Sequence, residues 1–78
     1  MSREEVLAQL IEFAAMAYGV DAAELTEETN LNDLGVASSQ RVAMSASIEN
    51  DFDVMIPVAR FGNFESIGAI VDFIMDEM

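Results

Sequence analysis

Apolar side chains recur every three or four residues near the start of the chain, on one face of a helix. That face consists of Val6, Leu7, Leu10, Ile11, Ala14 and then Ala17 or Tyr18. Ser2 followed by Glu5 forms the pairing that caps the beginning of a helix, and Gly19 is a residue type that commonly ends one. The pattern therefore predicts a first helix from Arg3 to Tyr18.

The helical spacing is lost between residues 20 and 37, where acidic and turn-forming residues predominate. We expect four apolar residues to hold this segment to the core, namely Leu25, Leu31, Leu34 and Val36. A loop of this length is unusual in a compact domain, and the ends of such loops often carry function. The end that joins the next helix is therefore a candidate location for a site.

The rest of the chain predicts one long, one very short and one final helix. The second helix runs from residue 38 or 39 to 50 or 51, and its expected buried face is Val42, Ala46 or Ser45, Ile48 and Phe52. Pro57 is suited to open a short helical turn that ends at Phe61. Asn63 can cap the last helix, whose apolar stripe is Ile67, Ile70, Val71 and Ile74. We predict an all-α fold: a small four-helix bundle, three main helices plus one short, forming a single domain over residues 1–78.

Composition argues against an enzyme. The chain has no cysteine and no histidine, so the usual thiol nucleophile, the usual general base and the favoured zinc ligands are all missing. Lysine is absent as well, which leaves a serine nucleophile without a common activating base. The acids at Glu49, Asp51 and Asp53 lack the loop of a calcium hand and are better interpreted as a solvated helix end. We expect neither catalysis nor a metal site.

Charge narrows the range of partners. The formal net charge is -12, with fifteen acidic residues against three arginines. Such a surface disfavours nucleic acid and anionic membranes and suits partners with basic docking faces, although acidity can also serve only to keep a small domain in solution. No apolar run is long enough for a signal peptide or a membrane span. We expect a cytoplasmic protein, and a small acidic bundle is expected to be a monomer.

Ser38 is the candidate for chemistry. It stands where the long loop opens the second helix, and a helix N-terminus offers unpaired N–H groups and the positive end of the helix dipole. A phosphate ester would be favourable there. The alternative interpretation is that Ser38 or Ser39 is merely an N-cap, the commonest role of serine at such a position.

The run Asp33-Leu34-Gly35-x-x-Ser38 resembles the attachment signature of acyl carrier proteins, which normally reads Asp-Leu-Gly-x-Asp-Ser-Leu. The resemblance continues without gaps through Phe52-Asp53 and Ile56-Pro57 into the last helix and covers essentially the whole chain. It implies a 4'-phosphopantetheine arm on Ser38 that holds acyl groups as thioesters. It also implies a phosphopantetheinyl transferase and acyl ligase or synthase enzymes as partners.

The resemblance further implies a place for the cargo and a docking surface. The acyl pocket would lie between helices two and three, near Met44, Ile48, Ile56, Phe61 and Phe64. Three methionines, Met16, Met44 and Met55, are expected to reach the interior, where flexible thioethers suit a variable chain or simply fill the core. Partner docking falls to the second helix, at Gln40, Arg41 and Met44.

Two departures from the signature adjoin the attachment residue. Ala37 replaces the acid that normally precedes the serine, and Ser39 replaces the leucine that follows it. Residues 38 to 48 contain no acid and one base, Arg41, although this helix is acidic in the family. We therefore expect a specialised carrier rather than the housekeeping carrier of fatty acid synthesis. The alternative is a carrier-like interaction module that is never modified. The sequence leaves the cargo open among fatty, polyketide, aminoacyl and other small acids, and it favours an acyl cargo.

Overall fold

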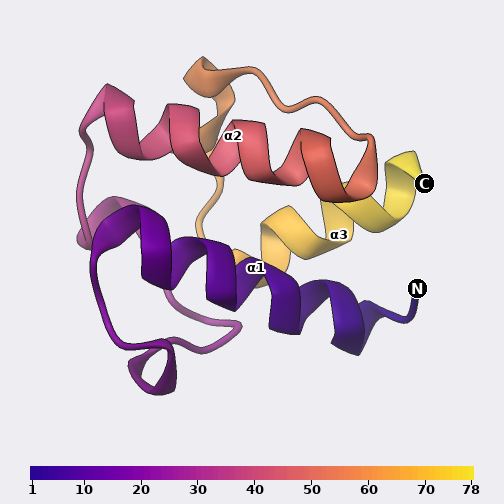
Figure 1. Ribbon diagram of the computed structural model, residues 1–78, viewed down its shortest axis with the longest axis horizontal. Helices are drawn as coiled ribbons and strands as arrows, with labels where there is room; N and C mark the ends of the chain where they lie inside the picture. The colour runs from indigo at the N-terminus through magenta and orange to yellow at the C-terminus, as the bar shows by residue number, and fades with distance from the viewer.

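The computed structural model describes all residues, Met1–Met78, as three α-helices joined by irregular segments that contain short 3-10 turns (Figure 1). The α-helices are α1 (Arg3–Tyr18), α2 (Ser38–Phe52) and α3 (Ile67–Glu77), and the 3-10 turns are η1 (Ala22–Glu24), η2 (Leu31–Asp33) and η3 (Val58–Asn63). In Figure 1, α1 and α2 run side by side in opposite directions, and α1 packs against both α2 and α3. The predicted all-α bundle with a short third helix and a long loop after the first is confirmed.

Helix α1 has the predicted bounds and both predicted end signals. The Ser2 hydroxyl accepts from the Glu5 N–H at 3.2 Å, and the Ser2 N–H donates to the Glu5 carboxylate at 3.0 Å. This reciprocal pair satisfies two of the N–H groups that a helix start leaves open. At the other end, Gly19 has a φ of 68°, the left-handed conformation that glycine adopts without strain.

The interior is a single apolar cluster with no buried polar side chain. Along α2 the buried residues are Met44, Ile48 and Phe52, spaced four apart on one face. The predicted face was partly wrong, because Val42 is 52% exposed and Ala46 is exposed as well. Val42 lies two residues from Met44, and residues two apart on a helix point to nearly opposite sides.

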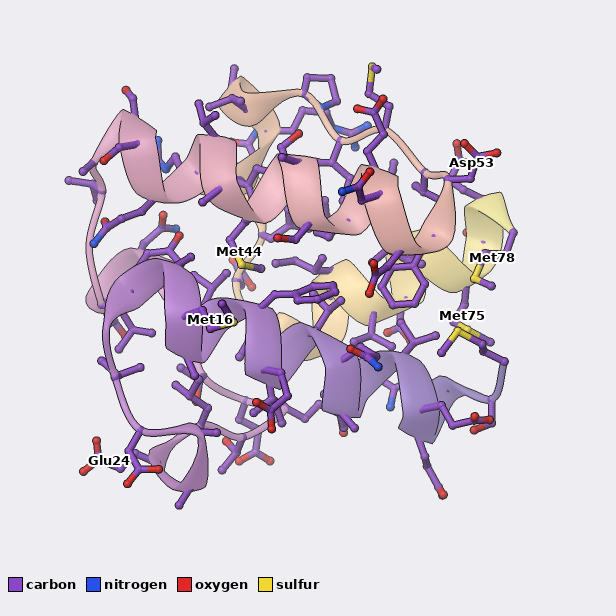
Figure 2. The ribbon with its side chains drawn as sticks, in the orientation of Figure 1. Met16, Glu24, Met44, Asp53, Met75 and Met78 are labelled. Carbon is purple, nitrogen blue, oxygen red and sulfur yellow. The ribbon has the colours of Figure 1, made fainter.

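The predicted positions of the methionines were right for one residue of three. Met44 is completely buried, and Figure 2 shows it pointing from α2 into the space between α2 and α1. Met16 is 83% exposed and Met55 is 66% exposed, so neither reaches the interior. Met16 follows Glu12 on the outer face of α1, and Met55 alternates with the buried Val54 and Ile56 in an extended segment.

The long loop is held to the core by fewer residues than the sequence predicted. Leu25 and Leu31 are buried and Leu34 is half-buried, but Val36 is 66% exposed because the chain has by then turned outward toward α2. The loop also caps α3, since the Thr29 and Glu27 carbonyls accept from the first two N–H groups of that helix at 2.8 Å each. Those backbone bonds fix the loop across the start of α3.

The last helix begins later than predicted. Its N-cap is Ser66, whose hydroxyl accepts from the Ala69 N–H at 3.1 Å, and not Asn63. Asn63 instead ends η3, which runs two residues beyond the predicted end at Phe61. The reason is local: the Phe64 N–H donates to the Phe61 carbonyl at 3.3 Å, so the turn stays closed through Asn63.

Two of the three arginines, Arg3 and Arg60, join α3 to other parts of the chain. Arg3 pairs with Glu27 of the loop and, at 2.8 Å, with Asp72 of α3. Hydrogen bonds to these two carboxylates raise the pKa of the Arg3 guanidinium above its usual value. Arg60 of η3 lies over the ring of Phe73 in α3, 4.8 Å from its centroid, in a cation–π contact.

Candidate functional site

A pair of turns brings the chain to the beginning of α2. The Asn30 side chain caps η2 by accepting from the Asn32 N–H at 2.9 Å. The Leu31 carbonyl then accepts from both the Leu34 and Gly35 N–H groups, at 3.0 and 3.2 Å. Leu34 packs half-buried against the core, whereas Asp33 is exposed. The Asp33-Leu34-Gly35 motif is therefore a closed turn anchored by its leucine.

Ser38 is the first residue inside α2, and Ala37 holds the N-cap position. The Ala37 carbonyl accepts from the Gln40 and Arg41 N–H groups at 3.1 and 3.3 Å, but its methyl side chain cannot accept a hydrogen bond. The interpretation of Ser38 or Ser39 as an N-cap is therefore wrong. The N–H groups of both serines donate to no acceptor within the chain, and both side chains are exposed.

The electrostatics of this helix start suit an anion. The first turn of α2 contains no acidic residue, and its two open N–H groups lie at the positive end of the helix dipole. Ser38 offers an accessible hydroxyl at the same place. A phosphodiester on that hydroxyl would find hydrogen-bond donors that the fold has left unused, so the residues present fit a phosphate-linked group.

Gln40 folds back over the turn that precedes Ser38. Its side-chain oxygen accepts from the Ala37 N–H at 3.3 Å. Its carboxamide lies so close to Gly35 that a Cβ on that glycine would stand 2.3 Å from the Gln40 oxygen. Gln40 is half-buried as a result, and its polar group is engaged with the loop.

Arg41 is also engaged within the molecule. Its guanidinium donates to the Asn32 side-chain oxygen at 3.0 Å, and the Asn32 amide group donates to the Gly62 carbonyl at 3.2 Å. These bonds link α2 to η2 and η3. Of the three residues predicted to dock a partner, Gln40 and Arg41 are thus half-buried and internally bonded. Met44 is fully buried, so it offers no surface to a partner and its prediction as a docking residue is corrected.

Four of the residues predicted to line an acyl pocket belong to the apolar core, and the fifth, Phe64, packs against it. Met44, Ile48, Ile56 and Phe61 are almost completely buried, and Phe64 is half-buried with its ring edge-on to Phe61 at 6.3 Å. The Ser45 hydroxyl ties α2 to this region by donating to the Ile56 carbonyl at 2.8 Å. These side chains form packed core, and their opening for a cargo stays a prediction. The hollow that the surface does have, about 270 Å³, is on α1 and is lined by Met1, Glu5, Ala8, Gln9 and Glu12.

Comparison with known proteins decides the family. The family model described as "phosphopantetheine attachment site" matches residues 8–74, most of the chain. The chain belongs to the acyl carrier protein family.

Three relatives show how the carrier domain occurs both alone and within a larger enzyme. The acyl carrier protein of Thermotoga maritima is 32% identical over 74 residues, which cover 94% of this chain and 91% of that protein. The acyl carrier protein of Prochlorococcus marinus is 31% identical over 75 residues, with 95% and 94% covered. The bikaverin polyketide synthase of Gibberella fujikuroi is 30% identical over 73 residues, which cover 94% of this chain but only 4% of the synthase.

Membership settles the class of activity. Acyl carrier proteins are not catalysts, and this chain has the domain to which phosphopantetheine is attached in that family. A phosphopantetheine attachment domain implies a phosphopantetheinyl transferase and a synthase as partners. None of the carrier's helices is both long and apolar enough to cross a membrane.

Two residues of the site had roles that the sequence did not reveal. Gln40 was predicted to face partners, yet it braces the attachment loop, and Asn32 was not singled out at all. Gln40 stands three residues after the N-cap, the position of the glutamate or glutamine in a capping box. That signal was hidden because the N-cap itself is Ala37, whereas the rule looks for serine or threonine there. The role of Asn32 depends on Gly62, thirty residues away, and has no local signal.

Proposed function

We propose that Ser38 carries the 4'-phosphopantetheine arm and that this carrier holds acyl groups for a specialised ligase or synthase. The single observation that carries the proposal is the start of α2. There an exposed serine stands beside two unused backbone N–H groups in a first turn without acids. Ser39 is one residue farther into α2 and replaces the leucine expected after the attachment serine, so it is the less favoured hydroxyl.

The loading step is a group transfer from coenzyme A. The Ser38 Oγ forms a bond to the phosphorus that bears the pantetheine, and the bond from that phosphorus to the neighbouring bridging oxygen breaks. The electron pair leaves with 3',5'-ADP, and the hydroxyl proton passes to a base of the transferase, because this chain has no histidine or lysine to take it. The two open N–H groups at the helix start then face the new phosphodiester.

The outward face of α2 supports a specialised partner. Its exposed residues in the first three turns are small or apolar, namely Ser38, Ser39, Val42, Ala43 and Ala46. Acidic residues begin only at Glu49, and Arg41 is bonded inward to Asn32. Each exposed ion pair contributes roughly 0.2–1 kcal/mol, so a carrier without several of them would bind a strongly basic docking face about ten- to a hundredfold more weakly. A partner with an apolar contact area, bordered by cations opposite Glu49 and Asp51, fits this face better.

The close packing of the residues predicted to line the pocket supports a short acyl cargo. Phe61 and Phe64 meet edge-on there, and Met44, Ile48 and Ile56 are completely buried. Close-packed interiors resist insertion of additional carbon atoms unless side chains move. A short chain requires less of that movement than a long one.

A second candidate, an unmodified interaction module, is favoured by one observation. Ala37 removes both the acid and the side-chain cap beside the attachment serine, within the surface that a transferase must contact. Such a module would bind partners through α2 without ever holding a cargo.

Covalent modification separates the two functions. The protein is incubated with coenzyme A and a broad-specificity phosphopantetheinyl transferase, and its intact mass is measured alongside Ser38→Ala and Ser39→Ala. We expect a single phosphopantetheine addition that is lost only in Ser38→Ala. If only Ser39→Ala abolished it, the attachment residue would be Ser39.

If the broad-specificity transferase does not modify the protein, the native protein is isolated from the cytoplasmic fraction of its cell, where we expect it. Its intact mass is then measured. An arm on the native protein would identify a dedicated transferase. A native protein without the arm would overturn the carrier proposal in favour of the interaction module.

A further inference from the structure

The segment between the Leu34 turn and Ser38 donates a hydrogen bond to one side chain of α2. Gln40 accepts from the Ala37 N–H at 3.3 Å, while Ala37 itself supplies no side-chain cap. We infer that Gln40 is a positioning residue for phosphopantetheine loading, because it orders the segment from Gly35 to Ser38 from which the hydroxyl is presented. This inference rests on the proposed attachment at Ser38.

The position of the hydrogen bond matters because it leaves the helix start open. An N-cap serine or aspartate accepts from the N–H groups of the second or third helical residue, which would be Ser39 or Gln40 here. The Gln40 side chain instead bonds backward to Ala37, upstream of the helix. The loop is thereby ordered without using the N–H groups of Ser38 and Ser39 that a phosphodiester would need.

Gly35 provides the room for this arrangement. A Cβ at Gly35 would stand 2.3 Å from the Gln40 Oε1 and 3.0 Å from its Cδ and Nε2, so any larger residue forces the carboxamide to move. The backbone of Gly35 does not adopt a positive φ, since Gly19 is the one glycine that does. The restriction on a side chain at position 35 is therefore steric, and the group that would have to move is the Gln40 carboxamide.

The experiment compares Gln40→Leu, which keeps similar bulk without an acceptor, with Gln40→Glu, which keeps the acceptor. Gln9→Leu is the matched control, since Gln9 is the other glutamine of the chain and is exposed on α1. Two quantities are measured at a temperature well below unfolding. One is hydrogen exchange of the Ala37 amide by NMR in the unmodified protein, and the other is kcat/KM for loading by a transferase that modifies the wild type.

We expect Gln40→Leu to speed exchange of the Ala37 amide and to lower loading kcat/KM roughly three- to tenfold, the range for loss of one capping interaction. Gln9→Leu should stay within about twofold of the wild type in both measurements, and Gln40→Glu should do so in exchange of the Ala37 amide, because each retains the Ala37 contact. Rescue by the glutamate would not occur if Gln40 contributed only bulk to the packing.

Gly35→Ala provides an independent route to the same state. The added Cβ displaces the Gln40 carboxamide although Gln40 is still present. The variant should therefore reproduce the faster exchange of the Ala37 amide and the slower loading of Gln40→Leu. Combining the two changes should add little to either one alone, because both remove the same hydrogen bond.

Separate results would overturn separate statements. Wild-type loading rates in Gln40→Leu would overturn the positioning role, and unchanged exchange of the Ala37 amide would overturn the contact itself. If neither the wild type nor any variant accepted an arm from any transferase, the proposed attachment at Ser38 would be overturned. The exchange data on the unmodified protein would still show whether Gln40 orders the loop.

Discussion

The starts of α1 and α2 solve the same problem in opposite ways. At α1, Ser2 and Glu5 cap each other, and Glu4 and Glu5 place negative charge at the positive end of the helix dipole. At α2, Ala37 has no acceptor and the first turn has no acid. Both are starts of long helices packed together, so the difference does not arise from helix length or burial.

The difference between the two helix starts indicates that one contributes to stability and the other is kept free for function. The start of α1 is closed by the protein's own groups, whereas the start of α2 keeps N–H groups available for another molecule. The open start needs support from elsewhere. It receives that support from Met44, buried in the core, and from the Gln40 side chain of α2 itself, which accepts from the Ala37 N–H before the helix.

The largest effect is expected from removing the support beneath α2. Met44→Ala deletes a fully buried side chain and should lower the free energy of unfolding by about 2–5 kcal/mol, since burial is lost and a cavity is left. Met16→Ala is the matched control, because Met16 is 83% exposed and its loss should cost less than about 0.5 kcal/mol. Urea unfolding of both variants provides the measurement. Equal losses would mean that α2 does not depend on Met44.

A smaller effect on the free energy of unfolding should distinguish Ser2 from Ser38. Ser2→Ala removes a working N-cap and should cost about 1 kcal/mol of unfolding free energy. Ser38→Ala should change stability by less than about 0.5 kcal/mol, because its hydroxyl makes no hydrogen bond within the chain. Thermal and urea unfolding of the unmodified proteins test both values. A cost at Ser38 as large as at Ser2 would make Ser38 a structural residue and remove the contrast between the two helix starts.

The smallest effect concerns pH at the closed start. The Ser2 N–H, and then the Ser2 hydroxyl contact, hold the pKa of the Glu5 carboxyl below its usual value. A depressed pKa in the folded state adds stability above the unfolded pKa, and that stability is lost as pH falls through the folded value. The advantage of the wild type over Glu5→Gln should therefore be present at pH 6 and shrink by pH 3. Urea unfolding at both pH values gives the difference, and a constant gap would contradict it.

Local signals in the sequence predicted the elements that depend on neighbouring residues. The bounds of α1 follow from Ser2, Glu5 and Gly19, all of which act within four residues of the helix end they define. The predicted start of α3 was wrong because asparagine and serine are both good N-caps, and one of each, Asn63 and Ser66, lies just before the helix. The choice between them is made by η3, which extends through Asn63 and leaves Ser66 to cap α3.

Tertiary contacts decided what the sequence could not. Val36, Val42 and Met55 are apolar yet exposed, since the turn of the loop and the rotation of α2 place other side chains inside. In the candidate site, the motif located Ser38 at the correct helix end. The inward bonding of Arg41 could not be predicted, because its partner Asn32 is placed by a contact with Gly62.

All three arginine side chains are engaged in contacts within the molecule, and this affects the interaction between copies of the protein in solution. Arg3 is paired with Glu27 and Asp72, Arg41 with Asn32, and Arg60 with aromatic rings. With a net charge of -12, two copies approaching in solution present mainly unpaired carboxylates. Their mutual repulsion should give a positive osmotic second virial coefficient that falls with added salt, as the screening length drops to about 10 Å near 0.1 M. A concentrated solution of this carrier should therefore scatter less light, per molecule, than a dilute one.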